Sequence, residues 1–511
     1  MGVSVILSPQ GWRGPDRSER MSWGATPVFG VGSTPCGTRP EAWRWRGMDD
    51  TTRNAPHRHV RPGDHTAAVR LQAAGWLMVA AVGLVLPYLV ILSGDPPRDP
   101  SLMRNLSYGL GFGALALAGL QFALTGRIKV LLRPFGADII PVFHRFLSWG
   151  AVALMLGHFA ILYLWHKDDM GVLNPLAAPA YMTAGRVALL CFVTLIVSSE
   201  FRKWLRLDYL WWRRLHVGLA LTGFAAAIWH VLGAGHFTGQ DGTRGLWLAV
   251  TVAWAGLIVY TRLIRPWRQS RNPWRVVENR DEGDDIRTLV LEPQGRPLRD
   301  WRPGQFAWLA VGGSPFSLRE HPFTISTAPD KGPRISFSIK PLGDDSARLA
   351  RTKPGTTAWI DGPYGVFTVD READADGFVM IAGGVGITPI MANLHALEAR
   401  RDPRPVHLLY ANDSWDEVAF RDELARMATR IDLHVTHVIQ NPPDRDWPPQ
   451  DHQVAEGRID ADLLARLLPA EARDWPHMMC GPAPMLEAIR PALRQMGVPL
   501  GRIHSEIFEM V

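Results

Sequence analysis

Cysteine is scarce in this 511-residue chain, which has only the widely separated Cys36, Cys191 and Cys480. This spacing provides neither a disulfide framework nor the C-x-x-C pair typical of zinc sites and thiol redox centres. Charge is also modest, because 20% of the residues are charged and the formal net charge is +6. Since the basic residues gather beside long apolar runs, they indicate membrane topology, and we expect no nucleic-acid partner.

The first 65 residues lack any helical or strand periodicity and mix Gly, Pro, Arg, Ser and Trp. This composition predicts a disordered N-terminal tail over residues 1–65. Its short apolar stretch at Met1–Ser8 lacks a basic n-region and a full-length apolar h-region, so we expect no secretory signal. Ile6 stands where an N-myristoylation sequence needs Ser or Thr. Met48 is an alternative initiator, which would leave residues 1–47 outside the mature protein.

Six long apolar runs follow, between Ala67 and Pro266. Each is long enough, at about 1.5 Å per residue, to cross roughly 30 Å of hydrocarbon. We predict an α-helical six-span transmembrane bundle over residues 66–268, with spans at 68–92, 106–124, 139–165, 181–199, 210–232 and 245–263. A multi-pass protein in contact with membrane lipid is therefore expected.

Positive charge distinguishes the two ends of these spans. It concentrates after the second, fourth and sixth spans, at Arg127, Lys129 and Arg133, at Arg202, Lys203, Arg206, Arg213 and Arg214, and at Arg262, Arg265 and Arg268. Such connections normally face the cytoplasm. We therefore expect both chain termini in the cytoplasm and the protein in the plasma or inner membrane.

Histidines recur at one spacing in two of the predicted spans. His144 and His158 are fourteen residues apart in the third span, and His216 and His230 are fourteen apart in the fifth. Fourteen residues make about 3.9 helical turns, so each pair shares a face and is separated by about 21 Å along the axis. If the helices face each other, His144 meets His216 near the cytoplasm and His158 meets His230 near the outside.

One intramembrane histidine is often only a hydrogen-bonding residue between helices. Four at matched depth favour metal binding, and two sites without carboxylates exclude a dinuclear metal centre. Paired axial imidazoles suit haem, and a six-coordinate haem favours electron transfer over ligand binding. Arg145, Arg213 and Arg214 lie close to these histidines and either pair with haem propionates or only set the topology.

From residue 272 to 372 short β segments predict a small antiparallel β-barrel. The segments are 275–277, 287–292, 305–311, 323–327, 334–340 and 357–361. This region contains the string H-P-F-T-I-S-T at 321–327, a helix start near Ser346 and D-G-P-Y-G at 361–365. A helix start offers free N–H groups to a pyrophosphate, although such starts are common without any ligand.

From residue 376 the apolar segments alternate between strand and helix patterns. Strands are predicted at 379–382, 406–410, 432–439 and 478–480, and helices at 389–399, 419–429, 461–467 and 484–495. This alternation predicts an α/β Rossmann-like domain with a doubly wound parallel sheet over residues 376–511. After the first strand stands the turn G-G-V-G-I-T-P at 383–389, where backbone can approach phosphate. A purely structural turn is the alternative, since the spacing is not G-x-G-x-x-G.

Five signals in this order resemble the ferric reductase and NADPH oxidase superfamily. They are the two H-x13-H pairs, H-P-F-T-I-S, D-G-P-Y-G, G-G-V-G-I-T-P and the triplet Cys480-Gly481-Pro482. The resemblance extends from residue 68 to the end of the chain. It implies that the membrane helices hold two b-type haems, that a ferredoxin-reductase-like barrel binds FAD, and that the last domain binds NADPH or NADH.

The resemblance also implies roles for individual residues. The four histidines would be the haem ligands, and the flavin would contact His321, Pro322, Phe323 and Thr324, with Ser326 in the same string and Ser346 at the pyrophosphate. The nucleotide phosphates would be held by Gly383, Gly384, Gly386, Thr388 and Pro389, while Cys480, Gly481 and Pro482 would lie by the nicotinamide. Phe508 resembles the aromatic that covers the flavin, so Phe508, Glu506 and Cys480 are the candidate catalytic residues.

Some positions depart from the family's pattern. Phe508 is followed by Glu509–Val511 and is not the last residue. Asp413 follows the second strand, where a 2′-phosphate would need Arg, which favours NADH or dual use, with a solvent-exposed acid as the alternative. No calcium-sensing loop is expected, because the loop that begins at Glu372 has Gly383 where an EF-hand needs Glu.

We therefore expect a transmembrane flavocytochrome that passes electrons from cytosolic NAD(P)H through FAD and two b-type haems to an outer acceptor. The flavin is required because a hydride carries two electrons and a haem accepts one. The acceptor is O₂, giving superoxide, or a ferric chelate, and the alternative function is to supply electrons to a periplasmic or extracellular redox partner protein. His166 and His236 lie on outer loops and either organise the acceptor or are ordinary surface histidines. The oligomeric state is not predicted.

Overall fold

The computed structural model describes two long parts of the chain and several shorter ones. Its described residues are 101–129, 139–172, 174–175, 177–239, 241–442, 447 and 452–507, together with 74, 75, 78, 81, 85, 88 and 89. The predicted tail over residues 1–65, most of the predicted span at 68–92, and Phe508 all lie outside these residues. Predictions about them therefore stay predictions.

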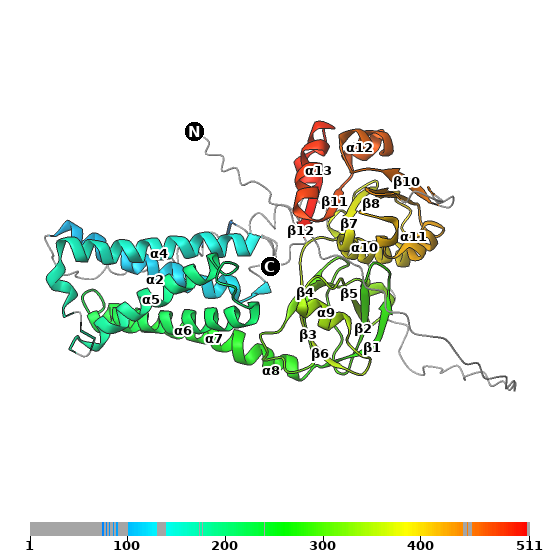
Figure 1. Ribbon diagram of the computed structural model, residues 1–511. Helices are drawn as coiled ribbons and strands as arrows, with labels where there is room; N and C mark the ends of the chain where they lie inside the picture. The colour runs from blue at the N-terminus through cyan, green and yellow to red at the C-terminus, as the bar shows by residue number, and fades with distance from the viewer. Residues whose placement is uncertain are drawn as a thin grey trace, which may run out of the picture. The chain divides into compact units, whose positions relative to one another are not determined.

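Among the described residues, five helices are long and apolar enough to cross a membrane. They are α2 (Leu102–Thr125), α4 (Ile139–Trp165), α5 (Ala180–Glu200), α6 (Tyr209–Ala234) and α7 (Asp241–Val259), the last of which continues through a π-helical turn (Tyr260–Ile264) into α8 (Arg265–Ser270). These helices match the second to sixth predicted spans. α2 packs along α4, and α5 packs along α6 (Figure 1).

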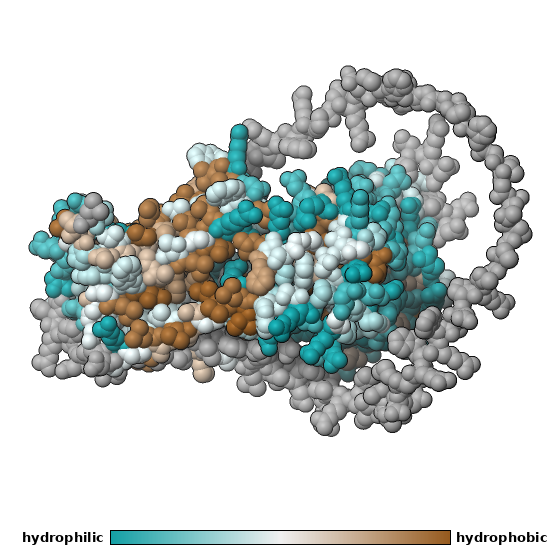
Figure 2. Space-filling view, turned by 90° about the horizontal axis from the view of Figure 1, so that it is seen from below, coloured by the Kyte–Doolittle hydropathy of each residue, from teal (hydrophilic) through white to brown (hydrophobic). Residues whose placement is uncertain are grey.

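Glycines allow these helices to approach closely. A Cβ atom added at Gly119 of α2 would lie 2.2 Å from the ring of Trp254 in α7, and one at Gly223 of α6 would lie 2.9 Å from Cβ of Cys191 in α5. Small residues at such contacts are typical of helix packing in membranes. Large apolar side chains point outward instead, as Figure 2 shows over the helical region, while hydrophilic side chains cover the sheets.

Both ends of α6 have capping interactions. At its start the Asp208 carboxylate accepts a hydrogen bond from the backbone N–H of Trp211. At its end Gly235 adopts a left-handed conformation with φ of 65°, and its N–H donates to the carbonyl of Val231. Both devices satisfy backbone groups that a helix terminus leaves unpaired. They fix the length of the helix that carries His216 and His230.

A six-stranded antiparallel sheet follows the helices, in the order β4-β3-β6-β1-β2-β5. Its strands are β1 (Trp274–Asp281), β2 (Arg287–Pro293), β3 (Phe306–Val311), β4 (His321–Thr324), β5 (Ile335–Ile339) and β6 (Thr357–Tyr364), with helix α9 (Asp344–Ala350) between β5 and β6. An isolated bridge joins Ile325, just after β4, to Phe337 of β5 at the other end of the strand order. The antiparallel sheet agrees with the predicted strands, and its closure into a barrel stays a prediction.

The last region contains a six-stranded parallel sheet in the order β10-β9-β8-β7-β11-β12. Its elements are β7 (Phe378–Gly383), α10 (Ile387–Arg400), β8 (Val406–Asn412), α11 (Arg421–Ala428), β9 (Leu433–Ile439), β10 (Gln453–Glu456), α12 (Ala461–Leu467), β11 (His477–Gly481), α13 (Ala483–Gln495) and β12 (Ile503–Ile507). The predicted strands and helices all appear, and β10 and β12 are additional.

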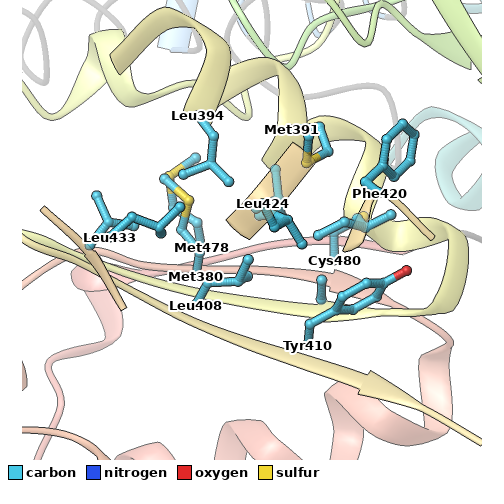
Figure 3. Close-up of a cluster of buried hydrophobic side chains, with 14 of the residues drawn as sticks. Met380, Met391, Leu394, Leu408, Tyr410, Phe420, Leu424, Leu433, Met478 and Cys480 are labelled. Atoms are coloured by element: carbon cyan, nitrogen blue, oxygen red, sulfur yellow. The ribbon is translucent and has the colours of Figure 1, made fainter. Parts of the chain in front are cut away.

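The core of this region lies between the sheet and the helices that cover it. Figure 3 shows Met391 and Leu394 of α10 directed toward Met380, Leu408 and Met478 of the strands. All five side chains are almost completely buried. Burying each such side chain stabilises the fold by about 1.5–3 kcal/mol. This packing holds the loops at the strand ends in place.

Candidate functional site

The order in which the chain adds strands to the parallel sheet reverses next to the first strand, β7. From β7 the chain proceeds to β8, β9 and β10 on one side, and then crosses to β11 and β12 on the other. In open α/β sheets, ligands bind outside the carboxyl ends of the strands at such a switch point. The glycine-rich turn follows β7 and the triplet Cys480-Gly481-Pro482 ends β11, so both candidate motifs flank it.

Close backbone packing explains the glycines of these two motifs. A Cβ atom at Gly386 would lie 2.2 Å from the carbonyl oxygen of Cys480, and one at Gly383 would lie 2.6 Å from Sδ of Met485. Gly384 has φ of 51°, a left-handed conformation that glycine adopts without the steric cost of a Cβ atom. The turn forms a short 3-10 helix over Gly384–Gly386 that leads into α10. Thr388 and Pro389 are buried in the first turn of that helix.

The candidate catalytic residues that the structure describes also lie at this edge. Cys480 is completely buried, and its strand pairs with β12 so that Cys480 is opposite Glu506. Glu506 in turn approaches the antiparallel sheet, because a Cβ atom at Gly365 would lie 3.5 Å from its Oε1. The D-G-P-Y-G string and Glu506 are therefore neighbours, although more than 130 residues separate them in the sequence.

The H-P-F-T string forms β4, at one end of the strand order of the antiparallel sheet. His321 Nε2 lies 3.4 Å from a carboxylate oxygen of Asp345 in the first turn of α9, so the string meets the predicted pyrophosphate helix. Burial lowers the pKa of His321, and nearby Asp345 partly offsets this effect. Pro322 is exposed, Phe323 is half-buried and Thr324 is buried.

Two serines singled out from the sequence have their hydroxyl groups engaged within the protein. Ser346 accepts hydrogen bonds from the N–H groups of Leu342 and Gly343, at 3.0 and 2.9 Å, and so caps its own helix. Ser326 is buried and bonds to the hydroxyls of Ser336 and Ser338 at 2.9 and 3.0 Å. Direct ligand contacts from these hydroxyls would require those bonds to rearrange.

The structure brings the four membrane histidines together in the two pairs that helical spacing predicts. The ring centres of His144 and His216 are 6.1 Å apart, and those of His158 and His230 are 6.3 Å apart. Two imidazoles that bind one metal ion through bonds of about 2 Å place their ring centres roughly 6 Å apart. Each pair therefore has a separation that suits a shared iron.

All four histidines use Nδ1 for a hydrogen bond within the protein. The partners are Gln121 Oε1 for His144 (2.7 Å), the carbonyl of Ser107 for His158 (2.8 Å), Ser199 Oγ for His216 (3.3 Å) and the carbonyl of Tyr181 for His230 (2.9 Å). Nε2 is then the nitrogen left for a metal. Such bonds orient metal-binding imidazoles and set their tautomer. Within the described part of the chain, no group of three or more metal-binding side chains occurs.

His158 and His230 line a cavity of about 320 Å³. Its lining is mostly apolar and includes Phe112, Leu115 and Phe192, with Arg186 and His236 among its polar members. An apolar cavity between helices, with few polar groups, is typical of sites that bind a large planar cofactor. Gly185 lies against the His230 ring, since a Cβ atom there would be 2.7 Å from Nδ1.

Two of the arginines that are close to these histidines in the sequence form ion pairs with carboxylates of the same chain. Arg145 pairs with Glu200 at 2.8 Å, and Arg213 pairs with Glu320 at 3.2 Å. Glu320 and Asp361 belong to a buried charge cluster that sequence reasoning missed. The available signal was their position, because Glu320 directly precedes H-P-F-T and Asp361 opens D-G-P-Y-G.

Comparison with known proteins identifies relatives of part of the chain. A flavohemoprotein of Bordetella pertussis is 29% identical over 46% of this chain and 60% of its own length. NADH-cytochrome b5 reductase 1 of Emericella nidulans is 30% identical over 33% of this chain and 56% of its own. The crystal structure of the FAD/NAD-binding domain of a nitric oxide dioxygenase from Vibrio cholerae O1 biovar El Tor is 26% identical, with a TM-score of 0.41, over 46% of this chain and 98% of that domain. The chain thus spans about three fifths of the length of the first curated relatives.

Two protein-family models match different parts of the chain. The model of the ferric reductase like transmembrane component matches residues 110–228, a range that contains all of the paired histidines except His230. The model of the oxidoreductase NAD-binding domain matches residues 380–491, which contain the glycine-rich turn and Cys480. The chain therefore combines a ferric reductase-like membrane component with an oxidoreductase NAD-binding domain, which confirms its resemblance to the ferric reductase and NADPH oxidase superfamily.

Proposed function

We propose that this chain is a transmembrane flavocytochrome that oxidises cytosolic NAD(P)H and delivers the electrons, through FAD and two b-type haems, to an acceptor outside the membrane. The observation that carries the proposal is the pair of histidine sites between α4 and α6, with ring centres 6.1 and 6.3 Å apart. Each site offers two imidazoles with Nε2 available, as axial haem ligation requires.

The nucleotide-binding role rests on the switch point of the parallel sheet. The backbone of Gly383, Gly384 and Gly386 would hold the phosphates at the start of α10, where unpaired N–H groups and the helix dipole favour negative charge. Gly481 and Pro482 border the same edge, and Cys480 is buried directly beneath it. The nicotinamide would then lie at the carboxyl ends of β7 and β11, close to Glu506.

The flavin-binding role rests on β4 and the adjoining first turn of α9. His321, Phe323 and Thr324 would contact the flavin, while the exposed Pro322 shapes the edge of the strand. Gly365 brings the D-G-P-Y-G string within reach of Glu506, so a flavin on the antiparallel sheet would face the nicotinamide site. Phe508, the candidate covering aromatic, lies just beyond the described strand β12.

The bound groups would supply the electron chemistry, because a flavin accepts a two-electron hydride and a haem iron accepts one electron. For every NAD(P)H oxidised, two electrons and one proton are released, and two one-electron acceptors are reduced outside. The chain's own contribution is to hold these groups in order and to exclude water from the membrane sites. Arginines and lysines at 127, 129, 202, 203, 265 and 268 favour a cytoplasmic location for the sheets and both termini.

Spectroscopy of the purified protein tests this function. The reduced-minus-oxidised spectrum and a chemical haem assay are expected to give b-type haem at two per chain, together with one FAD. NADH or NADPH added without oxygen should bleach the flavin and then reduce both haems. Absence of haem would overturn the histidine interpretation, and haem that NAD(P)H never reduces would overturn the electron path.

The outer acceptor is then identified by kinetics. We expect reduced protein mixed with O₂ to reoxidise its haems rapidly and release superoxide if the chain is an oxidase. Slow reoxidation by O₂ combined with fast reoxidation by a ferric chelate would assign a metalloreductase. If both are slow, the chain supplies a separate extracytoplasmic redox protein, which is the alternative function.

A further inference from the structure

A buried cluster of charges joins the cytoplasmic ends of the membrane helices to the antiparallel sheet. Its members are Glu320 and Asp361 from the sheet region, Arg127 just after α2, Arg213 in the first turns of α6, and Arg265 at the start of α8. We call these five residues the charge cluster. Its side chains are 9–21% exposed, so water screens their charges only weakly.

Arg127 is the central cation of the charge cluster. Its Nη2 lies 2.6 Å from Glu320 Oε1, and its Nη1 lies 3.3 Å from Asp361 Oδ2. The guanidinium plane also lies over the Trp308 ring, 3.6 Å from the ring centre. A planar guanidinium can pair with two carboxylates and stack on an aromatic ring at once, which an ammonium group cannot do.

The other two arginines come from different membrane helices. Arg213 donates from Nη2 to Glu320 Oε1 at 3.2 Å and from Nη1 to the carbonyl of Leu318 at 2.6 Å. Arg265 Nε lies 3.8 Å from Asp361 Oδ2, and its Nη1 donates to the carbonyl of Gly126 at 2.8 Å. Asp361 also accepts a hydrogen bond from Tyr364 at 2.8 Å. Three separate membrane segments therefore converge on two carboxylates.

The Glu320 carboxylate remains ionised. Although burial opposes the charge, the pKa of Glu320 is held below its ordinary value by Arg127 and Arg213. Burial also opposes the charge of Arg127, and Glu320 and Asp361 outweigh that effect and raise its pKa. Removing one partner would leave an uncompensated buried charge, which proteins tolerate poorly.

The positions of the two key residues relate the cluster to both candidate cofactor sites. Glu320 directly precedes His321 of the H-P-F-T string, and Arg213 lies three residues before His216 of the inner histidine pair. The 3.2 Å ion pair between them therefore connects β4 to the helix that carries His216. Glu320 directly precedes a strand and Arg213 lies within a helix, so regular secondary structure adjoins or contains both partners of the ion pair.

We propose that Glu320 and its arginine partners are positioning residues that hold the flavin-binding sheet at the correct distance and angle from the inner histidine pair. This inference rests on the proposed function. Glu320 does not touch the reacting groups in this role. It sets how readily single electrons cross from the sheet to the membrane site, two crossings for each NAD(P)H oxidised. Misplacement of reacting groups by about 1 Å can slow a reaction on the order of 100-fold.

The variant Glu320→Gln tests the proposal, because it removes the charge and keeps the shape. In anaerobic stopped-flow mixing with NADH, we expect flavin bleaching at the wild-type rate and haem reduction slowed by at least about tenfold. Glu292→Gln is the matched control, since Glu292 forms an exposed ion pair with Arg334 in the same sheet. Its flavin and haem phases should both equal those of the wild type.

Two further variants keep the test independent of folding defects. Arg213→Gln removes the partner from the membrane side, and the double variant should be hardly slower than either single one if the two residues act as a pair. Glu320→Asp retains the charge and should restore part of the rate that Glu320→Gln loses. A general loss of structure would not follow charge in this way and would slow flavin bleaching as well.

Each outcome has one meaning. Unchanged haem reduction in Glu320→Gln and in Arg213→Gln, with normal flavin bleaching, would overturn the positioning role while leaving the proposed function intact. Slowing that is equal in Glu320→Asp and Glu320→Gln would also overturn it, because charge would not be the cause. A wild-type protein whose haems NADH never reduces would instead overturn the proposed function.

Discussion

Gly386 packs so closely against Cys480 that a Cβ atom at position 386 would lie 2.2 Å from the Cys480 carbonyl oxygen. Gly386→Ala must therefore push the glycine-rich turn and the end of β11 apart, at a cost of about 1–3 kcal/mol. If this edge binds the nucleotide, we expect NADH affinity to fall by at least about tenfold, measured as the concentration dependence of flavin reduction. Gly501→Ala is the control, since nothing lies within 4 Å of its added Cβ atom. Equal affinity in both variants would contradict the assignment.

His158→Ala removes one imidazole of the outer pair. Under the proposed function the outer site would be the last one before the acceptor, so we expect loss of one haem per chain and loss of electron delivery to O₂ or a ferric chelate. Flavin bleaching by NADH and reduction of the inner haem should persist. His434→Ala, at an exposed position in the nucleotide domain, should keep both haems. Continued acceptor reduction by His158→Ala at the wild-type rate would exclude electron transfer through the outer pair.

Gly185→Ala tests the orientation of the His230 ring without removing it. The added Cβ atom would lie 2.7 Å from Nδ1 of His230, so the ring must turn and its 2.9 Å hydrogen bond to the Tyr181 carbonyl must weaken. Because such bonds tune a ligating imidazole, we expect an altered spectrum and midpoint potential for the outer haem only. Gly218→Ala is the control. Gly218 lies on the same helix as His230, and nothing lies within 4 Å of its added Cβ atom, so both haems should remain unchanged.

Two buried histidines predict acid sensitivity of the nucleotide-binding domain. Burial lowers the pKa of His437 to about 4, with His452 adding to the effect, and burial also lowers the pKa of His477 to about 4. Both stay neutral in the folded state while the unfolded chain takes up protons near pH 6.5. The free energy of unfolding should therefore be highest above that pH and fall as the pH drops toward 4, by about 1.4 kcal/mol per pH unit for each histidine.

Urea denaturation at several pH values measures this slope. His477→Leu, which cannot take up the proton, should remove about half of the decline. An unchanged slope in that variant would show that other groups cause the acid sensitivity.

Local patterns predicted most secondary structure because neighbouring residues decide it. The helix at 461–467 and the strand beginning near 433 follow from apolar periodicity alone. The strand Ile503–Ile507 was missed, because its sequence, I-H-S-E-I, is short and its pairing with β11 involves residues far away in the chain. Similarly, matched spacing predicted which histidines meet, since helical geometry repeats along each span.

The charge cluster illustrates what a single sequence conceals. Arg127 was interpreted as a topology signal, which is the usual role of a cation after a membrane span. Its pairing with Glu320 and Asp361 joins residues about 200 positions apart, and no local pattern encodes such a contact. Ser346 is a second example, because a helix start resembles a phosphate site whether its hydroxyl is free or, as here, used as a cap.

Only three residues separate the end of α8 at Ser270 from the start of β1 at Trp274. Three residues reach at most about 11 Å when fully extended, so the sheet is tethered to the last membrane span. Such a tether sets an effective concentration in the millimolar range or above, whatever the amount of protein in the membrane. The antiparallel sheet and the membrane histidine sites therefore meet without diffusion of separate molecules. If the proposed function holds, turnover per molecule should be the same in dilute and in crowded bilayers.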